Sequence, residues 1–129
     1  QRWRNEQNIT NKDEIMKVTV FGSRGISGSK AEKIIKEKLD SFRSITHIVS
    51  GESKGVETLA IKYADSRGIE YTPFPIWETE EEGEQRLHDM LEGTHYVIAF
   101  YDGKSEGTKK GIQFARDLDI PTETVFITE

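Results

Sequence analysis

The chain has 129 residues, no cysteine, a formal net charge of −5 and a pI near 5.3. This length predicts one domain, and the missing thiols exclude disulfides and thiolate metal sites, as expected in a reducing cytoplasm. The acidic balance disfavours a general nucleic-acid binder, and the lack of a long apolar span or signal-like segment disfavours membrane attachment.

The first fifteen residues differ in character from the rest of the chain. They are polar and charged and have no clear apolar period. We interpret residues 1–15 as an appendage that is disordered, left from the expression vector or loosely docked. Residues 16–129 are predicted to form a single domain.

From Met16 onward the hydrophobic pattern alternates between strand-like and helical segments. Runs rich in β-branched and aromatic residues predict strands over residues 17–23, 46–51, 70–75, 95–101 and 122–128. Helical spacing of apolar residues predicts helices over residues 29–42, 54–68, 81–93 and 108–120. Ser29 and Glu32 have the spacing of a capping box, which predicts a start near Ser29, and Gly68 predicts the end of the second helix.

This alternation with short connections predicts an α/β protein. We expect a Rossmann-like three-layer sandwich whose mostly parallel sheet has about five strands and is flanked by helices. Pro73 places the third strand at the margin of the sheet, whereas the fourth is apolar on both faces, as in a covered strand. Right-handed crossovers bring the C-terminal ends of all the strands to one edge.

Three loops at that edge are rich in glycine and serine, and each precedes a helix. Their sequences are GSRGISGS (22–29), SGESKG (50–55) and YDGKSEGT (101–108). Helix starts offer free amides and positive potential, glycine permits close approach, and ligands of open α/β sheets bind at this edge. The three loops together predict a phosphate cradle, although each alone is also explained by a turn glycine and a capping serine. Neither G-x-G-x-x-G nor G-x-x-x-x-G-K-[ST] is present, which disfavours a simple dehydrogenase or P-loop NTPase.

Four segments in order resemble the YspA-like branch of the SLOG superfamily. They are VTVFGSRG, ITHIVSGESKGVETLAIKYADSRGI, GEQRLHDMLEGTHYVIAFYDGKSEGTKKGI and ARDLDIP, and the resemblance runs from about Met16 to the C-terminus. It implies a Rossmann-like fold associated with nucleotides, their derivatives and related ligands. The superfamily also includes the LOG phosphoribohydrolases, which cleave the base from a nucleoside monophosphate, and the DNA-processing protein Smf/DprA.

The resemblance implies a set of ligand-binding positions in this chain. They are Gly22, Ser23, Arg24, Gly51, Lys54, Gly55, Arg86, Asp102, Gly103, Ser105, Gly107 and Thr108. Arg24 and Lys54 would neutralise phosphate, and Asp102 would bond a sugar hydroxyl; surface salt bridges or solvated loops are the ordinary alternatives for the basic residues. The chain departs from the family at Glu52, Glu57 and Leu87, where the family has glycine, aspartate and asparagine.

Whether the chain is an enzyme depends on one carboxylate. LOG enzymes carry a glutamate three residues after the threonine of a PGGxGTxxE loop, and the corresponding residue here is Gly111. Glycosidic cleavage needs a carboxylate, for which Glu57, Glu52 and Asp102 are the candidates. We therefore expect nucleotide binding, with an N-glycosidase acting on a nucleoside monophosphate as the alternative and an interaction or DNA-processing accessory protein as the second alternative.

The remaining expectations concern metals, cofactors and partners. His47, His88 and His95 lack metal-ligand spacing, so neither a metal nor a cofactor is expected. The expected partner is a nucleotide-like small molecule and not nucleic acid, and Tyr101 is a candidate to stack on its base. Such folds often pair as homodimers, but the sequence does not indicate an interface.

Overall fold

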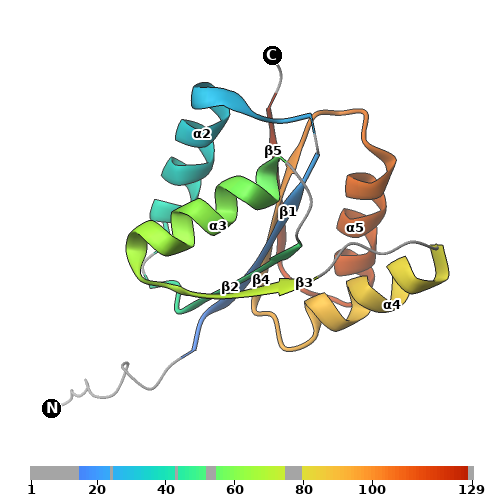
Figure 1. The fold of residues 1–129 in the computed structure, drawn as a ribbon. Coiled ribbons are helices and arrows are strands. Elements are labelled where there is room, and N and C mark those ends of the chain that lie inside the picture. The colour runs from blue at the N-terminus through green and yellow to red at the C-terminus, as the bar shows by residue number, and fades with distance from the viewer. Residues whose placement is uncertain (1–14, 24, 43, 52–54, 75–79, 128–129) are drawn as a thin grey trace, which may run out of the picture.

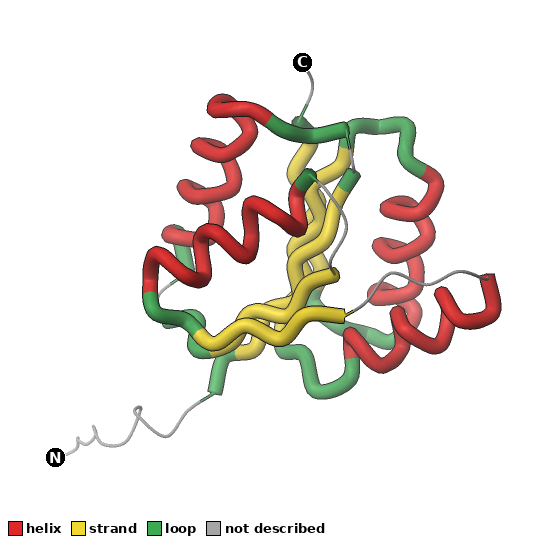
Figure 2. The backbone as a smooth tube through the Cα atoms, viewed as in Figure 1, coloured by secondary structure: helices red, strands yellow, loops and turns green. Residues whose placement is uncertain are grey.

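The structure, a computed structural model, describes residues 15–23, 25–42, 44–51, 55–74 and 80–127. Its elements are β1 (Lys17–Gly22), α2 (Gly28–Asp40), β2 (His47–Gly51), α3 (Val56–Arg67), β3 (Glu70–Phe74), α4 (Glu80–Leu91), β4 (Tyr96–Tyr101), α5 (Glu106–Asp117) and β5 (Thr122–Phe126). The strands form one all-parallel sheet in the order β3-β2-β1-β4-β5, with helices on both sides (Figure 1; Figure 2). The predicted α/β Rossmann-like sandwich is confirmed.

Each face of the sheet has its own hydrophobic core, because successive strand residues point to opposite sides. Val18 and Val20 belong to the core under α2 and α3, whereas Phe21 belongs to the core under α4 and α5. Figure 1 shows these helix pairs on opposite sides of the strands. β4 lies between β1 and β5 and is buried on both faces, which explains its continuous apolar run. Pro73 lies in β3 at an outer edge of the sheet, as predicted.

The cap of α2 and the start of α5 differ from the prediction. α2 begins at Gly28, with Ser27 at its N-cap position, so the capping box starting at Ser29 is wrong. Glu32 forms an ion pair with Lys62 of α3 at 3.0 Å, a tertiary contact that local spacing does not reveal. α5 begins at Glu106 and not at Thr108, because the hydroxyl of Ser105 caps it two residues earlier.

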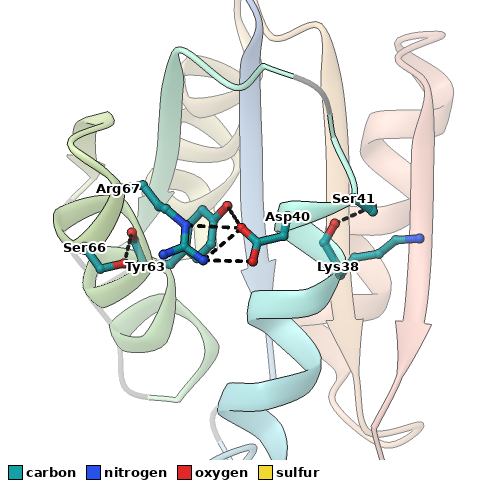
Figure 3. Close-up of polar contacts among 6 residues, drawn as sticks. All are labelled: Lys38, Asp40, Ser41, Tyr63, Ser66 and Arg67. Atoms are coloured by element: carbon teal, nitrogen blue, oxygen red, sulfur yellow. Dashed lines mark hydrogen bonds and ion pairs between the residues drawn. The ribbon is translucent and has the colours of Figure 1, made fainter.

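The C-terminal ends of α2 and α3 are joined by polar contacts of Asp40. The Tyr63 hydroxyl donates to Asp40 Oδ1 at 2.6 Å, and Arg67 Nη2 donates to Asp40 Oδ2 at 2.8 Å (Figure 3). The hydrogen bonds from Arg67 and then Tyr63 lower the pKa of Asp40. These contacts fix the relative placement of the two helices that cover one face of the sheet.

The predicted appendage lies outside the described residues except for Ile15, which is exposed. Within the described part of the chain, no helix combines the length and apolarity needed to cross a membrane.

Candidate functional site at the C-terminal edge of the sheet

The candidate site lies where the strand order reverses. From β1 the chain proceeds to β2 and β3 on one side and then crosses to β4 and β5 on the other. Gly22 of β1 is in register with Phe100 of β4, so the loops that follow these two strands leave the same edge of the sheet. In open α/β sheets, this reversal separates the two loops and makes the usual ligand crevice.

Ser23 connects these two loops. Its backbone N–H donates to Phe100 O at 3.0 Å, and its Oγ accepts from the backbone N–H of Asp102 at 3.1 Å. Ser23 Oγ also lies 3.4 Å from Thr108 Oγ1 in the first turn of α5. Both hydroxyl residues are buried, at 1% and 4% exposure, so their first role is to hold the loops together.

Asp102 shapes the loop between β4 and α5. Its Oδ1 accepts from the backbone N–H groups of Lys104 at 2.8 Å and Ser105 at 2.9 Å. Gly103, between Asp102 and Lys104, has a φ of +85°, a left-handed conformation that glycine adopts without strain. The amides of Lys104 and then Ser105 lower the pKa of Asp102, because they stabilise the ionised carboxylate. Asp102 is therefore a turn-forming anion and a poor general acid.

This pKa shift gives a testable pH dependence. Because the folded-state pKa of Asp102 is depressed, its contribution to stability is complete above the unfolded-state pKa of about 3.9 and is lost as the pH falls through the folded value. We expect Asp102→Asn to flatten the fall in the free energy of unfolding below about pH 5. Urea unfolding across this pH range measures the effect. Asp65→Asn, at an exposed position of α3, is the control and should follow the wild type.

The first turn of α5 is open at Gly107. Ser105 Oγ accepts from the backbone N–H of Thr108 at 3.3 Å and from its hydroxyl at 3.1 Å. Gly107 is exposed, and a Cβ added to it would meet no atom within 4 Å. Among the described residues, none accepts a hydrogen bond from the Gly107 amide. A ligand can therefore approach this turn closely.

The loop after β2 contributes Gly51 and Gly55. Gly55 is the N-cap residue of α3 and has a φ of +83°. Glu57 is only 8% exposed, and its carboxylate lies against Gly51, since an added Cβ at Gly51 would be 3.1 Å from Glu57 Oε1. Gly51 O accepts from the Tyr71 hydroxyl at 2.9 Å. The absence of a side chain at Gly51 thus makes room for a carboxylate of the protein itself.

Gly22 and Gly111 serve close packing of the protein. A Cβ at Gly22 would lie 2.4 Å from Phe100 O and 2.5 Å from Val56 Cγ2. A Cβ at Gly111 would lie 2.8 Å from Cε1 of Phe21, where α5 packs on the sheet. At position 111, which the sequence resemblance would align with the LOG glutamate, an added methyl group would force the Phe21 ring to move.

The two glycines of α5 should respond differently to alanine. We expect Gly111→Ala to lower the free energy of unfolding by about 1–3 kcal/mol, because the Phe21 ring must move. Gly107→Ala should leave it unchanged or raise it by up to about 0.5 kcal/mol, since alanine favours the helix and meets no neighbour. Urea unfolding of both variants measures the difference. Equal losses at the two positions would contradict the packing at Gly111.

The structure brings together part of the predicted site. Ser23, Asp102, Ser105 and Thr108 form one connected group of hydrogen bonds. Arg24, Glu52 and Lys54 lie outside the described residues. Arg86 is placed in α4, but its side chain is not described. No group of three metal-ligating side chains occurs in the described part of the chain.

Sequence reasoning missed one feature of this edge. The ring of Phe126, which is 65% exposed, lies 5.6 Å between centroids from Tyr101. The two residues are in register on β5 and β4. The apolar run that contains Phe126 predicted the strand, but only the register reveals its aromatic neighbour.

The comparisons with known proteins leave the family open. A scan against protein-family models finds no match, and searches of curated proteins and of solved structures also find none. The fold is therefore established by its own strand order and ladders. The resemblance to the SLOG superfamily stays a prediction that rests on the sequence motifs.

Proposed function

We propose that this chain binds a nucleotide or nucleotide-derived ligand at the C-terminal edge of the sheet, with a phosphate at the start of α5. The observation that carries the proposal is the convergence of Ser23, Asp102 and Thr108 from both sides of the strand-order reversal. The adjoining first turn of α5 is open at Gly107. Amides at a helix start combined with such a crevice suit an anionic group.

The burial of the hydroxyls divides the roles within this proposed site. Ser23 and Thr108 are buried and set the loop geometry, whereas the exposed backbone at Gly103 and Gly107 faces the ligand. Arg24 and Lys54 are proposed to neutralise the phosphate from their loops. The carboxylate of Asp102 is engaged through Oδ1 by its own loop.

Calorimetric titration with nucleoside mono- and diphosphates and with inorganic phosphate tests the proposal. We expect the wild type to bind at least one phosphorylated probe and Gly107→Glu to bind it at least tenfold more weakly, because a carboxylate would occupy the anion position. Acidic residues near a helix N-terminus are compatible with the helix, so the variant should fold. Gly107→Ala is the control and should retain affinity. Equal affinity of the Glu and Ala variants would contradict the placement of the phosphate.

One observation favours the N-glycosidase alternative. Glu57 is a buried carboxylate in the first turn of α3, against Gly51 at the end of β2, on the same C-terminal edge of the sheet as the proposed phosphate position. It is the candidate to stabilise an oxocarbenium-like centre, because the sequence resemblance would align Gly111 with the LOG glutamate. This alternative predicts release of free base from a nucleoside monophosphate and its loss in Glu57→Gln. Binding without any release at high protein concentration would leave the binding function alone.

A further inference from the structure

β5 forms an outer edge of the sheet, and only half of its backbone groups bond to β4. The backbone N–H of Val97 donates to Pro121 O at 2.9 Å, and the N–H of Ile127 donates to Tyr101 O at 3.0 Å. The backbone groups of the odd-numbered residues in this segment, from 121 to 127, thus point toward β4. Because successive strand residues direct their backbone groups to opposite sides, the even-numbered residues face outward.

The outward residues are Thr122, Thr124 and Phe126. Within the described residues, none makes a hydrogen bond to their backbone N–H or C=O groups across this edge. Proteins usually blunt such an edge with proline or lysine, as Pro73 does in β3 at the other edge. The TETVF sequence of β5 contains neither residue. This edge therefore retains the backbone pattern that pairs with another strand.

We propose that β5 pairs antiparallel with β5 of a second copy of this chain, about a twofold axis at Thr124. The axis places Thr124 opposite the partner's Thr124 and Thr122 opposite the partner's Phe126. In this register, each residue whose backbone groups point outward lies opposite another such residue of the partner. Each pair can therefore form two backbone hydrogen bonds, one N–H to C=O in each direction. The two sheets become one continuous sheet, and the exposed ring of Phe126 gains a neighbour on the partner strand.

The side chains select this register over its neighbours. Centring the pair on Glu123 would place two carboxylates directly opposite each other, which is destabilising. Centring it on Val125 would leave Thr122 without a counterpart. With Thr124 on the axis, Glu123 faces the partner's Val125 and keeps its ion pair with Lys38 of α2.

The two Thr124 side chains would lie side by side at this axis. Thr124 Oγ1 is buried and has no hydrogen-bond partner among the described residues. Directly opposed residues in antiparallel strands have Cβ atoms about 5 Å apart on the same face. Because Oγ1 is enclosed in the isolated chain, the Thr124 side chain has to change rotamer before the two hydroxyls can bond each other; paired threonines are a favourable cross-strand combination.

A single engineered cysteine tests the register, because the chain contains no cysteine of its own. The two Cα atoms at the axis should lie about 5.5 Å apart, which suits a disulfide. We expect Thr124→Cys to form a covalent dimer under mild oxidation. Val125→Cys is the matched control and should remain largely uncrosslinked, because its counterpart lies two residues along the partner strand. Crosslinking at position 125 in preference to 124 would overturn the register.

Amide hydrogen exchange of the unmodified protein tests the pairing itself. We expect protection of the Thr124 and Phe126 amides to rise with protein concentration, together with a shift to dimer in sedimentation velocity. The amides of Glu123 and Val125 bond to β4 and should be protected at every concentration. A monomer at all concentrations, with outward amides that always exchange freely, would overturn the proposal. The outcome does not depend on nucleotide binding.

Discussion

Alanine at position 22 is expected to lower the free energy of unfolding by about 3 kcal/mol, at the upper end of the usual range for overpacking. The added methyl would lie 2.4 Å from the carbonyl oxygen of Phe100 and 2.5 Å from Cγ2 of Val56. The carbonyl belongs to the interior strand β4, and Val56 is the first residue of α3. Neither neighbour is the end of a flexible side chain, so β1 must separate from β4 or α3 must move away.

Gly25→Ala is the matched control for this prediction. Gly25 lies three residues further along the same loop, and a Cβ there would meet no atom within 4 Å. Urea unfolding should show a change below about 0.5 kcal/mol at this position, as for most exposed substitutions. If Gly22→Ala were as stable as Gly25→Ala, the close contact between β1, β4 and α3 would not exist in solution.

Phe100→Ala is expected to cost about 3–5 kcal/mol, because it removes a large side chain from a closely packed core. Phe100 has 0% exposure and belongs to the core shared by α2, α3 and the central strands. It also precedes the loop that carries Asp102. We therefore expect loss of the native fold at moderate urea concentrations.

Phe126→Ala makes the same chemical change at an exposed position and serves as the control. Its ring is 65% exposed, so its removal should change the free energy of unfolding by less than about 0.5 kcal/mol in dilute protein. The comparison of the two variants by thermal and urea unfolding separates burial from the loss of a phenyl group. Equal destabilisation would contradict the burial of Phe100.

The fold was predictable because its signals are local and repeated. Alternating strand and helix patterns, together with the handedness of crossovers, determine a parallel sheet flanked by helices. Pro73 correctly indicated an edge strand. The start of α2 is within one residue of the predicted position, but the capping box was wrong: Ser27 is the N-cap residue, and Glu32 pairs with Lys62 on another helix, a contact that depends on packing.

The candidate site was predictable only at the level of loops. Sequence identified Ser23, Asp102 and Thr108, and the strand register brings them together. The sequence alone could not distinguish a glycine that leaves space for a ligand from a glycine that is packed against other atoms of the protein. Gly22 and Gly107 look alike in sequence, yet the first is enclosed by Phe100 and Val56 and the second is open. That distinction depends on which residues face each other across strands and helices.

The central claim is that a phosphorylated ligand binds at the C-terminal edge of the sheet, at the loops that follow β1 and β4. Amide chemical-shift mapping tests this claim most directly. Isotope-labelled protein would be titrated with nucleoside mono- and diphosphates and with inorganic phosphate. We predict that the shifted amides gather at Ser23, Gly55 and the segment from Gly103 to Thr108. Shifts confined to the opposite edge, around Thr46 and Thr94, or no shifts with any phosphorylated probe, would contradict the claim.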